Sequence, residues 1–346
     1  MRLHGVPGDK EVIVLGIEST AHTIGVGVAS NKPPHLLANV NRRYVPASGG
    51  IHPREASRFL AENAPGVLEE ALKASRLGMD EIDAVAVALG PGMGPCLRVG
   101  ATVARALAAY YEKPLVPVNH AVAHIEIGIL LSGFEDPLVV YVSGGNTAVI
   151  AFKEGKYRTF GETLDVALGN LLDTFAREAG LAPPYVKGGV HVVHLCSSEA
   201  RGEELLDLPY VVKGQDVSFS GLLTAALKML RERPSSLPEI CRSLVEISFS
   251  MVTEVAERGL AHTGKKEVLL TGGVAASEQL REKLKVMAES HGAKFYGVPP
   301  EYAGDNGAMI AWTGVLAHLR GVRVDPEKAL VAQRWRVDEV EVPWRA

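Results

Sequence analysis

Cysteine is scarce in this chain of 346 residues, and its three cysteines lie far apart in the sequence. Cys96, Cys196 and Cys241 form no Cys-x-x-Cys pair. We therefore expect neither a disulfide framework nor a structural zinc knuckle. We interpret all three as small residues in or near the core of a protein from a reducing compartment.

Long hydrophobic runs and a signal-peptide pattern are also absent. Charged residues such as Arg105, Glu112 and Lys113 break the longest apolar runs before they reach the roughly 20 residues that cross a bilayer. We therefore expect a cytoplasmic protein without membrane contact. The chain is 47% hydrophobic and 22% charged, which is an ordinary globular composition, and its length suggests two domains.

Positive charge is not in excess, because the formal net charge is −4. Binding to nucleic acid draws mainly on lysine and arginine contacts to phosphate, so we do not expect this chain to hold a nucleic acid alone. A surface shared with a basic partner stays open. Two nucleotide motifs are missing as well: the sequence has neither a Walker loop nor a strand-linked Gly-x-Gly-x-x-Gly with a following acid.

Two segments with the same pattern suggest an internal duplication. Residues 12–29 and 138–152 each read as a buried strand, a small polar turn ending in Thr, and a second strand. We predict two similar α/β domains, 1–135 and 136–346, with a helical insertion in the second. The last helix, 306–320, can pack back on the first domain.

Two histidines four residues apart form the most informative motif. His120 and His124 stand in an apolar, helix-favouring run, and residues at i and i+4 share one face of a helix. Both rings could therefore reach one metal ion, although transition metals usually take further protein ligands. Ala121 replaces the glutamate base of a zinc-protease helix, which argues against that class. A chance spacing on a half-buried helix is the alternative.

Small-residue turns follow three strands, at 18–23, 143–147 and 271–277. Paired glycines let backbone N–H groups approach an anion closely, although each turn could also be only a tight turn. Asp165 is interpreted as a helix cap, whereas Asp173 lies among apolar helix residues and needs a polar partner. Asp305 precedes the last helix and is either its N-cap or the carboxylate that completes a metal site.

Taken together, these motifs resemble the universal tRNA N6-threonylcarbamoyladenosine transferase family, in its archaeal and eukaryotic form, the catalytic subunit of the KEOPS complex. The resemblance runs from Val14 to Trp344. It is carried by residues 16–23, 49–56, 90–95, 120–124, 141–147, 272–276, 304–307 and 334–340.

The resemblance implies an α/β actin-like ATPase (ASKHA) fold of two RNase-H-like domains with an interdomain cleft. It also implies one Fe²⁺ per subunit, with Zn²⁺ as an alternative, and an adenine nucleotide, either ATP or threonylcarbamoyl-AMP. The family's metal ligands fall on His120, His124, Tyr141 and Asp305. Its nucleotide and substrate contacts fall on Tyr141, Val142, Ser143, Gly144, Gly145, Asp173, Gly189, Val193 and Ser277.

The chain departs from the family pattern at three points of this contact set. Lys187 precedes two glycines where the family has Pro-Gly-Gly, with about three extra residues before it. Val193 stands where the archaeal form usually has a glutamate, and Ser277 replaces an asparagine. These changes suggest altered or weaker nucleotide contacts, while all four metal ligands are retained.

The activity that the resemblance implies is transfer of threonylcarbamoyl from threonylcarbamoyl-AMP to N6 of the adenosine that follows the anticodon, in tRNAs that read ANN codons, with release of AMP. We identify no general acid or base. The implied partners are tRNA, a kinase-like KEOPS subunit and a small dimerising subunit. Two alternatives stay open: a nucleotide-gated KEOPS scaffold without turnover, and a small-molecule phosphotransferase of the same fold.

Overall fold

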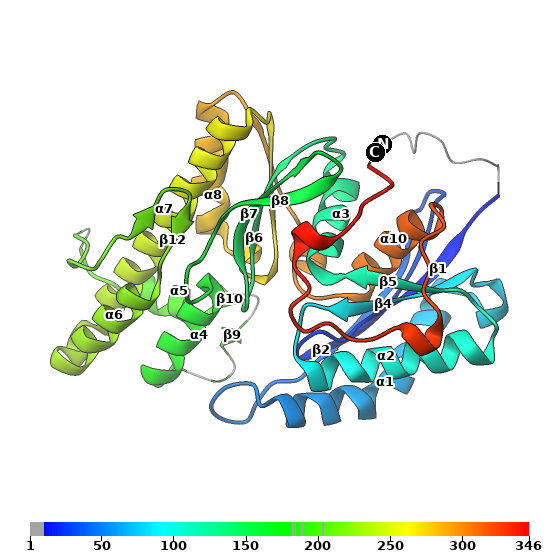
Figure 1. Ribbon diagram of the computed structural model, residues 1–346. Coiled ribbons are helices and arrows are strands. Elements are labelled where there is room, and N and C mark those ends of the chain that lie inside the picture. Colours follow the sequence, from blue (N-terminus) through cyan, green and yellow to red (C-terminus); the bar gives the residue numbers. More distant parts are fainter. Residues whose placement is uncertain (1–9, 182, 184, 188–189, 203, 346) are drawn as a thin grey trace.

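Two five-stranded sheets organise the chain in the computed structural model, which describes residues 10–181, 183, 185–187, 190–202 and 204–345 (Figure 1). The first sheet has the order β3-β2-β1-β4-β5, with β1 (Ile13–Glu18), β2 (Thr23–Ser30), β3 (Leu36–Arg43), β4 (Ala84–Gly90) and β5 (Leu115–Asn119). The second has the order β14-β13-β6-β7-β8, with β6 (Leu138–Val142), β7 (Thr147–Lys153), β8 (Lys156–Glu162), β13 (Glu267–Thr271) and β14 (Lys294–Gly297).

The two sheets have the same topology. In the first, β1, β2 and β3 form an antiparallel meander, and β4 and β5 continue the sheet in parallel from β1. In the second, β6, β7 and β8 form the meander, and β13 and β14 continue in parallel from β6. The duplication predicted from the two strand–turn–strand segments is therefore present in the fold.

Helices cover both faces of the first sheet. The described residues form, around both sheets, the helices α1 (Pro53–Ser75), α2 (Gly94–Tyr110), α3 (His120–Ser132), α4 (Leu168–Glu178), α5 (Val192–Ser197), α6 (Ser220–Glu232), α7 (Leu237–Thr263), α8 (Glu278–Ser290), α9 (Pro300–Ala303) and α10 (Gly307–His318). One apolar cluster joins α1 and α2 to the first sheet, and a second joins α3 and α10 to its other face. A Cβ atom on Gly16 would lie 2.1 Å from the backbone nitrogen of Ala311, so glycine is what lets α10 approach β1 so closely.

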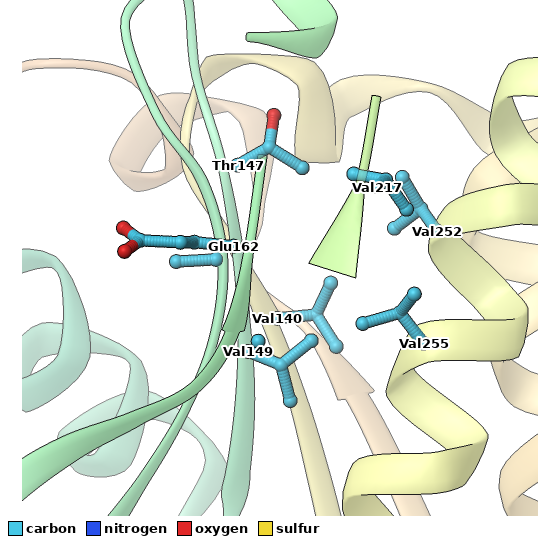
Figure 2. Close-up of a pocket in the computed structure, with 9 residues that line it drawn as sticks. Val140, Thr147, Val149, Glu162, Val217, Val252 and Val255 are labelled. Atoms are coloured by element: carbon cyan, nitrogen blue, oxygen red, sulfur yellow. The ribbon is translucent and has the colours of Figure 1, made fainter. Parts of the chain in front are cut away.

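Around the second sheet, four short strands accompany the helices: β9 (Val186–Lys187), β10 (Val190–His191), β11 (Val212–Lys213) and β12 (Asp216–Val217). A small apolar cavity lies between this sheet and α7, lined by residues such as Val140, Val149, Val252 and Val255 (Figure 2). Thr147 and Glu162 also line it, but the Thr147 hydroxyl accepts from Leu168 N and the Glu162 carboxylate points away from the valines (Figure 2). We therefore interpret the cavity as a packing gap in the core.

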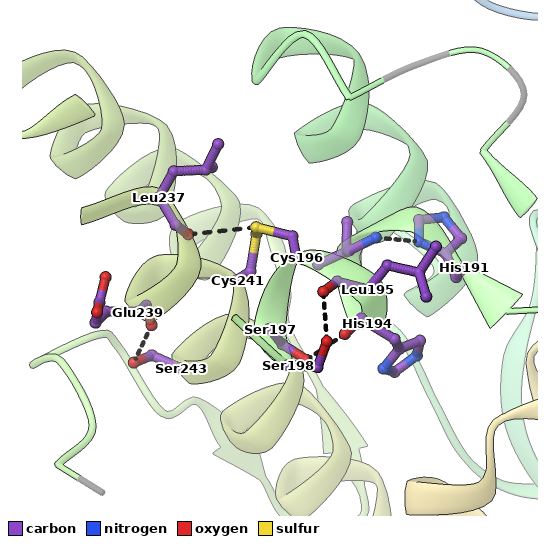
Figure 3. The surroundings of a disulfide bond; sticks show 11 residues. His191, His194, Leu195, Cys196, Ser197, Ser198, Leu237, Glu239, Cys241 and Ser243 are labelled. Atoms are coloured by element: carbon purple, nitrogen blue, oxygen red, sulfur yellow. Dashed lines mark hydrogen bonds between the residues drawn. A yellow bond between two sulfur atoms is a disulfide. The ribbon is translucent and has the colours of Figure 1, made fainter. Parts of the chain in front are cut away.

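The expectation of three separate cysteines is wrong for two of them. Cys196 of α5 and Cys241 of α7 form a disulfide, although 45 positions separate them in sequence (Figure 3). No sequence pattern indicated this bond, because the two cysteines meet only when α5 packs against α7. Cys96 is a buried free thiol, as expected.

The last segment of the chain connects the two sheets (Figure 1, red). The backbone nitrogen of Ala332 donates to Leu89 O at the end of β4, and Arg336 pairs with Glu162 at the end of β8. Further on, the Trp344 indole donates to Glu126 of α3. Within the residues described, the structure has no helix with the length and apolar character needed to cross a membrane.

Candidate metal centre

The histidine motif lies at the start of α3, where the chain enters a helix directly from β5. The side chain of Asn119 caps the helix by accepting from the backbone N–H groups of Ala121 and Val122, at 3.0 and 3.2 Å. The cap makes His120 the first helical residue and His124 its neighbour one turn on. Their rings are 4.7 Å apart between centroids, and both are buried.

Asp305 reaches the two histidines from the turn between α9 and α10. Its Oδ1 lies 3.5 Å from His120 Nε2 and 3.4 Å from His124 Nε2. One ligand atom from each of the three residues falls within 4.8 Å of the others, as a shared ion requires. Asn306, not Asp305, caps α10, because its side chain accepts from Met309 N. Of the two roles considered for Asp305, the helix cap is therefore excluded.

Tyr141 at the end of β6 comes to the same point, with its ring 5.1 Å from that of His124. Its hydroxyl is buried without a hydrogen-bond partner in the described structure. The ring nitrogens of His124 are also buried, and the 3.4 Å approach of Asp305 Oδ1 to Nε2 lacks hydrogen-bond geometry. Buried polar atoms without a partner are costly. A metal ion bound by these atoms would satisfy them, so the donor set of two imidazoles, a phenol and a carboxylate fits a transition metal.

Glu18 orients the first histidine. Its Oε2 lies 3.0 Å from His120 Nδ1, and its Oε1 accepts from the backbone nitrogen and hydroxyl of Thr20. A carboxylate on Nδ1 would leave the Nε2 lone pair available to a metal ion, which is the usual outer-sphere arrangement of metal-binding histidines. We did not predict this role from sequence. The only sequence signal was a glutamate at the end of a buried strand, next to a small polar turn.

Electrostatics at this point favour a positive charge, because Glu18 and Asp305 bring two carboxylates together. Burial alone would lower the pKa of His120, but Glu18, Tyr141 and Asp305 raise it well above its usual value. Burial would raise the pKa of Asp305, but the two histidines hold it well below its usual range. Burial also lowers the pKa of His124 and raises that of Tyr141.

Next to Tyr141, the turn at residues 143–146 follows directly from β6. Ser143 closes it, with Ser143 N donating to Asn146 O and Ser143 Oγ accepting from Asn146 N. Gly144 and Gly145 are exposed, and a Cβ on either would meet no atom within 4 Å. The turn therefore leaves open space beside its backbone, as an anion nest requires. Val142, by contrast, is fully buried at the end of the strand.

A second glycine turn lies beside the first, because β13 runs parallel to β6 with Thr271 opposite Tyr141. Gly272 has a φ of 96°, and a Cβ there would lie 2.2 Å from Val142 O, so only glycine fits. The chain then passes through the 3₁₀ helix η3 (Gly273–Ala276) to Ser277, whose hydroxyl caps α8. Ser277 is therefore at the edge of the same region, already engaged as a cap.

Helix α4 packs against the first turn, with a Cβ on Gly169 falling 2.7 Å from Gly144 Cα. One helical turn further on is Asp173, half-buried, whose Oδ1 lies 2.9 Å from His191 Nε2. His22 is within electrostatic reach of both Asp173 and Asp305, whose charges oppose the lowering of its pKa by burial. Asp173 thus belongs to the surroundings of the candidate metal centre.

The remaining predicted contacts lie elsewhere. Val193 is fully buried in the core of the second sheet and its helices, so its side chain offers a ligand nothing. Gly189 is outside the described residues, whereas Lys187 is exposed in β9. The interpretation of Asp165 as the cap of its own helix is wrong, because the N-cap of α4 is Ala167, which makes no side-chain cap bond. Asp165 instead accepts from the backbone of Phe219 and the hydroxyls of Ser218 and Ser220, at the start of α6.

Comparison with known proteins decides the family. A model of the tRNA N6-adenosine threonylcarbamoyltransferase family matches residues 35–312. The chain belongs to this family.

Relatives named tRNA N6-adenosine threonylcarbamoyltransferase support this membership along almost the whole chain. The Hyperthermus butylicus protein is 60% identical, with 99% of this chain and 95% of the relative covered. The Aeropyrum pernix protein is 59% identical, with 97% and 95% covered.

Solved structures of more distant proteins agree on the fold. HypF from T. kodakarensis aligns at a TM-score of 0.59 and 15% identity, covering 94% of this chain and 49% of HypF, so the chain spans about half of that protein. The (R)-2-hydroxyglutaryl-CoA dehydratase component A of Acidaminococcus fermentans aligns at 0.51 and 13%, covering 88% and 98%. The predicted α/β actin-like fold is thereby confirmed for this member of the threonylcarbamoyltransferase family.

Proposed function

We propose that the protein transfers the threonylcarbamoyl group of threonylcarbamoyl-AMP to N6 of the adenosine that follows the anticodon, in tRNAs that read ANN codons, forming t6A and releasing AMP. The observation that carries the proposal is the identity of 60% and 59%, over nearly the whole chain, to two relatives named for this activity. The arrangement of His120, His124, Asp305 and the glycine turns supports it, because metal-binding and anion-binding groups are adjacent.

His120, His124, Tyr141 and Asp305 are proposed as the ligands of one transition metal, with iron as the first choice and zinc as the alternative. This assignment is supported by the Tyr141 hydroxyl and the His124 ring nitrogens, which are buried and make no hydrogen bond within the described residues. When bound, the ion would supply a Lewis acid that favours negative charge on the donor. Glu18 holds His120 in the tautomer that keeps Nε2 available for binding.

The donor's phosphate is proposed to bind at the Ser143–Gly145 turn, beside the open space at Gly144 and Gly145. Backbone N–H groups there would stabilise the phosphate as AMP leaves. Val142, Asp173, Gly189 and Ser277 complete the proposed contact set. Among these, Asp173 is proposed to accept hydrogen bonds from the ribose hydroxyls. Val142 is proposed to contribute only its backbone, because its side chain is buried.

We also propose that the protein works in the cytoplasm within a KEOPS-type complex, with a kinase-like subunit and a small dimerising subunit. The net charge of −4 supports a need for partners that provide positive surface for tRNA. Filter binding at physiological salt tests this proposal. Tight, salt-resistant binding of tRNA by this chain alone would count against it.

The test of the function is transfer of labelled threonine to tRNA by the chain with its partner subunits and a threonylcarbamoyl-AMP synthase. We expect His120→Ala to abolish transfer, whereas His262→Ala, an exposed histidine in the last turn of α7, keeps it. Full transfer by the His120→Ala protein would exclude the catalytic role of this centre. It would instead favour a scaffold that has no turnover of its own.

A further inference from the structure

His191 holds Asp173 in a fixed geometry. His191 Nε2 lies 2.9 Å from Asp173 Oδ1, and the two side chains are 14% and 37% exposed. The pair connects α4, which packs on the proposed phosphate turn, with the hairpin of β9 and β10. Sequence reasoning did not identify His191, since 18 positions separate it from Asp173 and no spacing rule connects them.

The hydrogen bonds define the tautomer of His191. The backbone nitrogen of Val193 donates to His191 Nδ1 at 3.2 Å, capping α5. A backbone N–H can only donate, so Nδ1 must present a lone pair and the ring hydrogen is on Nε2. His191 therefore donates to Asp173 Oδ1. Both ring nitrogens are used, so the ring is not free to take a proton from a substrate without losing the cap.

Three contacts fix the segment that carries His191. The Cys196–Cys241 disulfide attaches α5 to α7, close to His191 (Figure 3). The backbone nitrogen of Val192 donates to Tyr185 O, and the Tyr185 hydroxyl donates to Gly49 O across the junction with the first half of the chain. The segment is thus attached both to α7 and to the first half of the chain. His191 is therefore held firmly enough to set the orientation of the Asp173 carboxylate.

Asp173 keeps an oxygen that can accept a further hydrogen bond. Because Oδ1 already accepts from His191, Oδ2 is the oxygen available to a new donor. Asp173 is four residues after Gly169, which touches the phosphate turn, and this is about 6 Å along a helix. A carboxylate at this spacing from a phosphate site is suited to the hydroxyls of a ribose, which Asp and Glu bind in other nucleotide sites.

We propose that His191 is a positioning residue that orients Asp173 toward the ribose hydroxyls of the adenine nucleotide, and so sets the preference of this site for ribonucleotides. The inference rests on the proposed function, because it takes the nucleotide to bind between the Ser143–Gly145 turn and Asp173. Val193 stands where the family usually has a glutamate that contacts the ligand, but its side chain is buried in the core. His191 acts on the ligand in a different way, by orienting Asp173.

The experiment compares the binding of AMP and 2′-deoxy-AMP to the full chain by calorimetry, with inorganic pyrophosphate as a probe of the phosphate turn alone. We expect the wild type to prefer AMP, and His191→Ala to reduce that preference by about tenfold, as loss of one hydrogen bond to a charged group predicts. Pyrophosphate binding should not change. His191→Gln should restore most of the preference, because its amide can both donate to Asp173 and accept from Val193 N.

Ser197→Ala is the matched control, since Ser197 lies in the same short helix and its hydroxyl donates within that helix to His194 O. An unchanged AMP preference in a folded His191→Ala protein would overturn the inference, as would an equal loss in Ser197→Ala. Failure of the wild type to bind any of the three probes would overturn the nucleotide site itself. If the chain still transferred threonine but His191→Ala left the preference for AMP over 2′-deoxy-AMP unchanged, only the positioning role of His191 would be refuted.

Discussion

Glu126 provides the sharpest test of how α3, the helix that carries His120 and His124, is held in place. It is fully buried on α3, and its Oε1 accepts from the Tyr157 hydroxyl at 2.7 Å and the Trp344 indole at 2.9 Å. Its Oε2 lies 3.6 Å from Arg345 Nη1, whose side chain is only 9% exposed. Burial alone would lower the pKa of Arg345, but Glu126 and Tyr157 raise it, so the guanidinium is charged.

Glu126→Ala would leave this buried cation without its carboxylate and would take the acceptor from two hydrogen-bond donors. Breaking a buried ion pair from one side typically costs about 3–5 kcal/mol. Each donor left without a partner costs about 1–3 kcal/mol, and the terms are not additive because the groups touch. We therefore expect the free energy of unfolding to fall by about 5 kcal/mol.

Urea unfolding followed by circular dichroism measures this effect. Glu162→Ala is the control, because Glu162 pairs with Arg336 of the same C-terminal segment at 3.3 Å, but both side chains are about half exposed. Such exposed pairs contribute up to about 1 kcal/mol. Adding Arg345→Met to Glu126→Ala should recover part of the lost free energy of unfolding, because the second substitution removes the unpaired buried cation. If Glu126→Ala were no more destabilising than Glu162→Ala, our account of the C-terminal segment as an anchor of α3 would be refuted.

Three further predictions concern the centre and its supports. Glu18→Gln should weaken metal affinity by about 10- to 100-fold in a competition titration with a chelator, and unchanged affinity would remove Glu18 from the outer sphere of the site. Replacing both Cys196 and Cys241 with Ala should lower stability by up to about 4 kcal/mol, from the entropy of closing the 45-residue loop between them; a thiol count of three in the unreduced, denatured wild type would show that the bond is absent. Burial lowers the pKa of His194 from 6.5 to about 4 in the folded protein, so the unfolded chain binds a proton more readily and stability should fall as pH falls from 6.5 toward 4. His194→Leu should flatten that pH dependence, and an identical slope in wild type and variant would contradict it.

Local patterns made much of the fold predictable. The helix at Pro53–Ser75 and the strand at Leu138–Val142 have the boundaries expected from proline, polarity and strand-forming residues. The spacing of His120 and His124 was enough to place both rings together, because that geometry belongs to a single helix.

Contacts between distant segments were not predictable in the same way. Glu18 meets His120 across 102 positions, and the sheet order that joins them becomes visible only in the folded chain. The target of the Asp165 cap was also missed, because α6 begins more than 50 residues after Asp165. The outcome for Val193 has a related cause: the position matched a motif, but α5 turns that side chain into the core.

The most direct measurement of the central claim is single-turnover transfer from threonylcarbamoyl-AMP to tRNA, with the assembled complex first stripped of metal and then titrated with Fe²⁺ or Zn²⁺. We expect transfer to be lost on stripping and to return as one metal ion per chain is bound, with no recovery in the His124→Ala protein. Full turnover by metal-free protein, or recovery in the His124→Ala variant, would contradict the claim that His120, His124, Tyr141 and Asp305 form the catalytic metal centre.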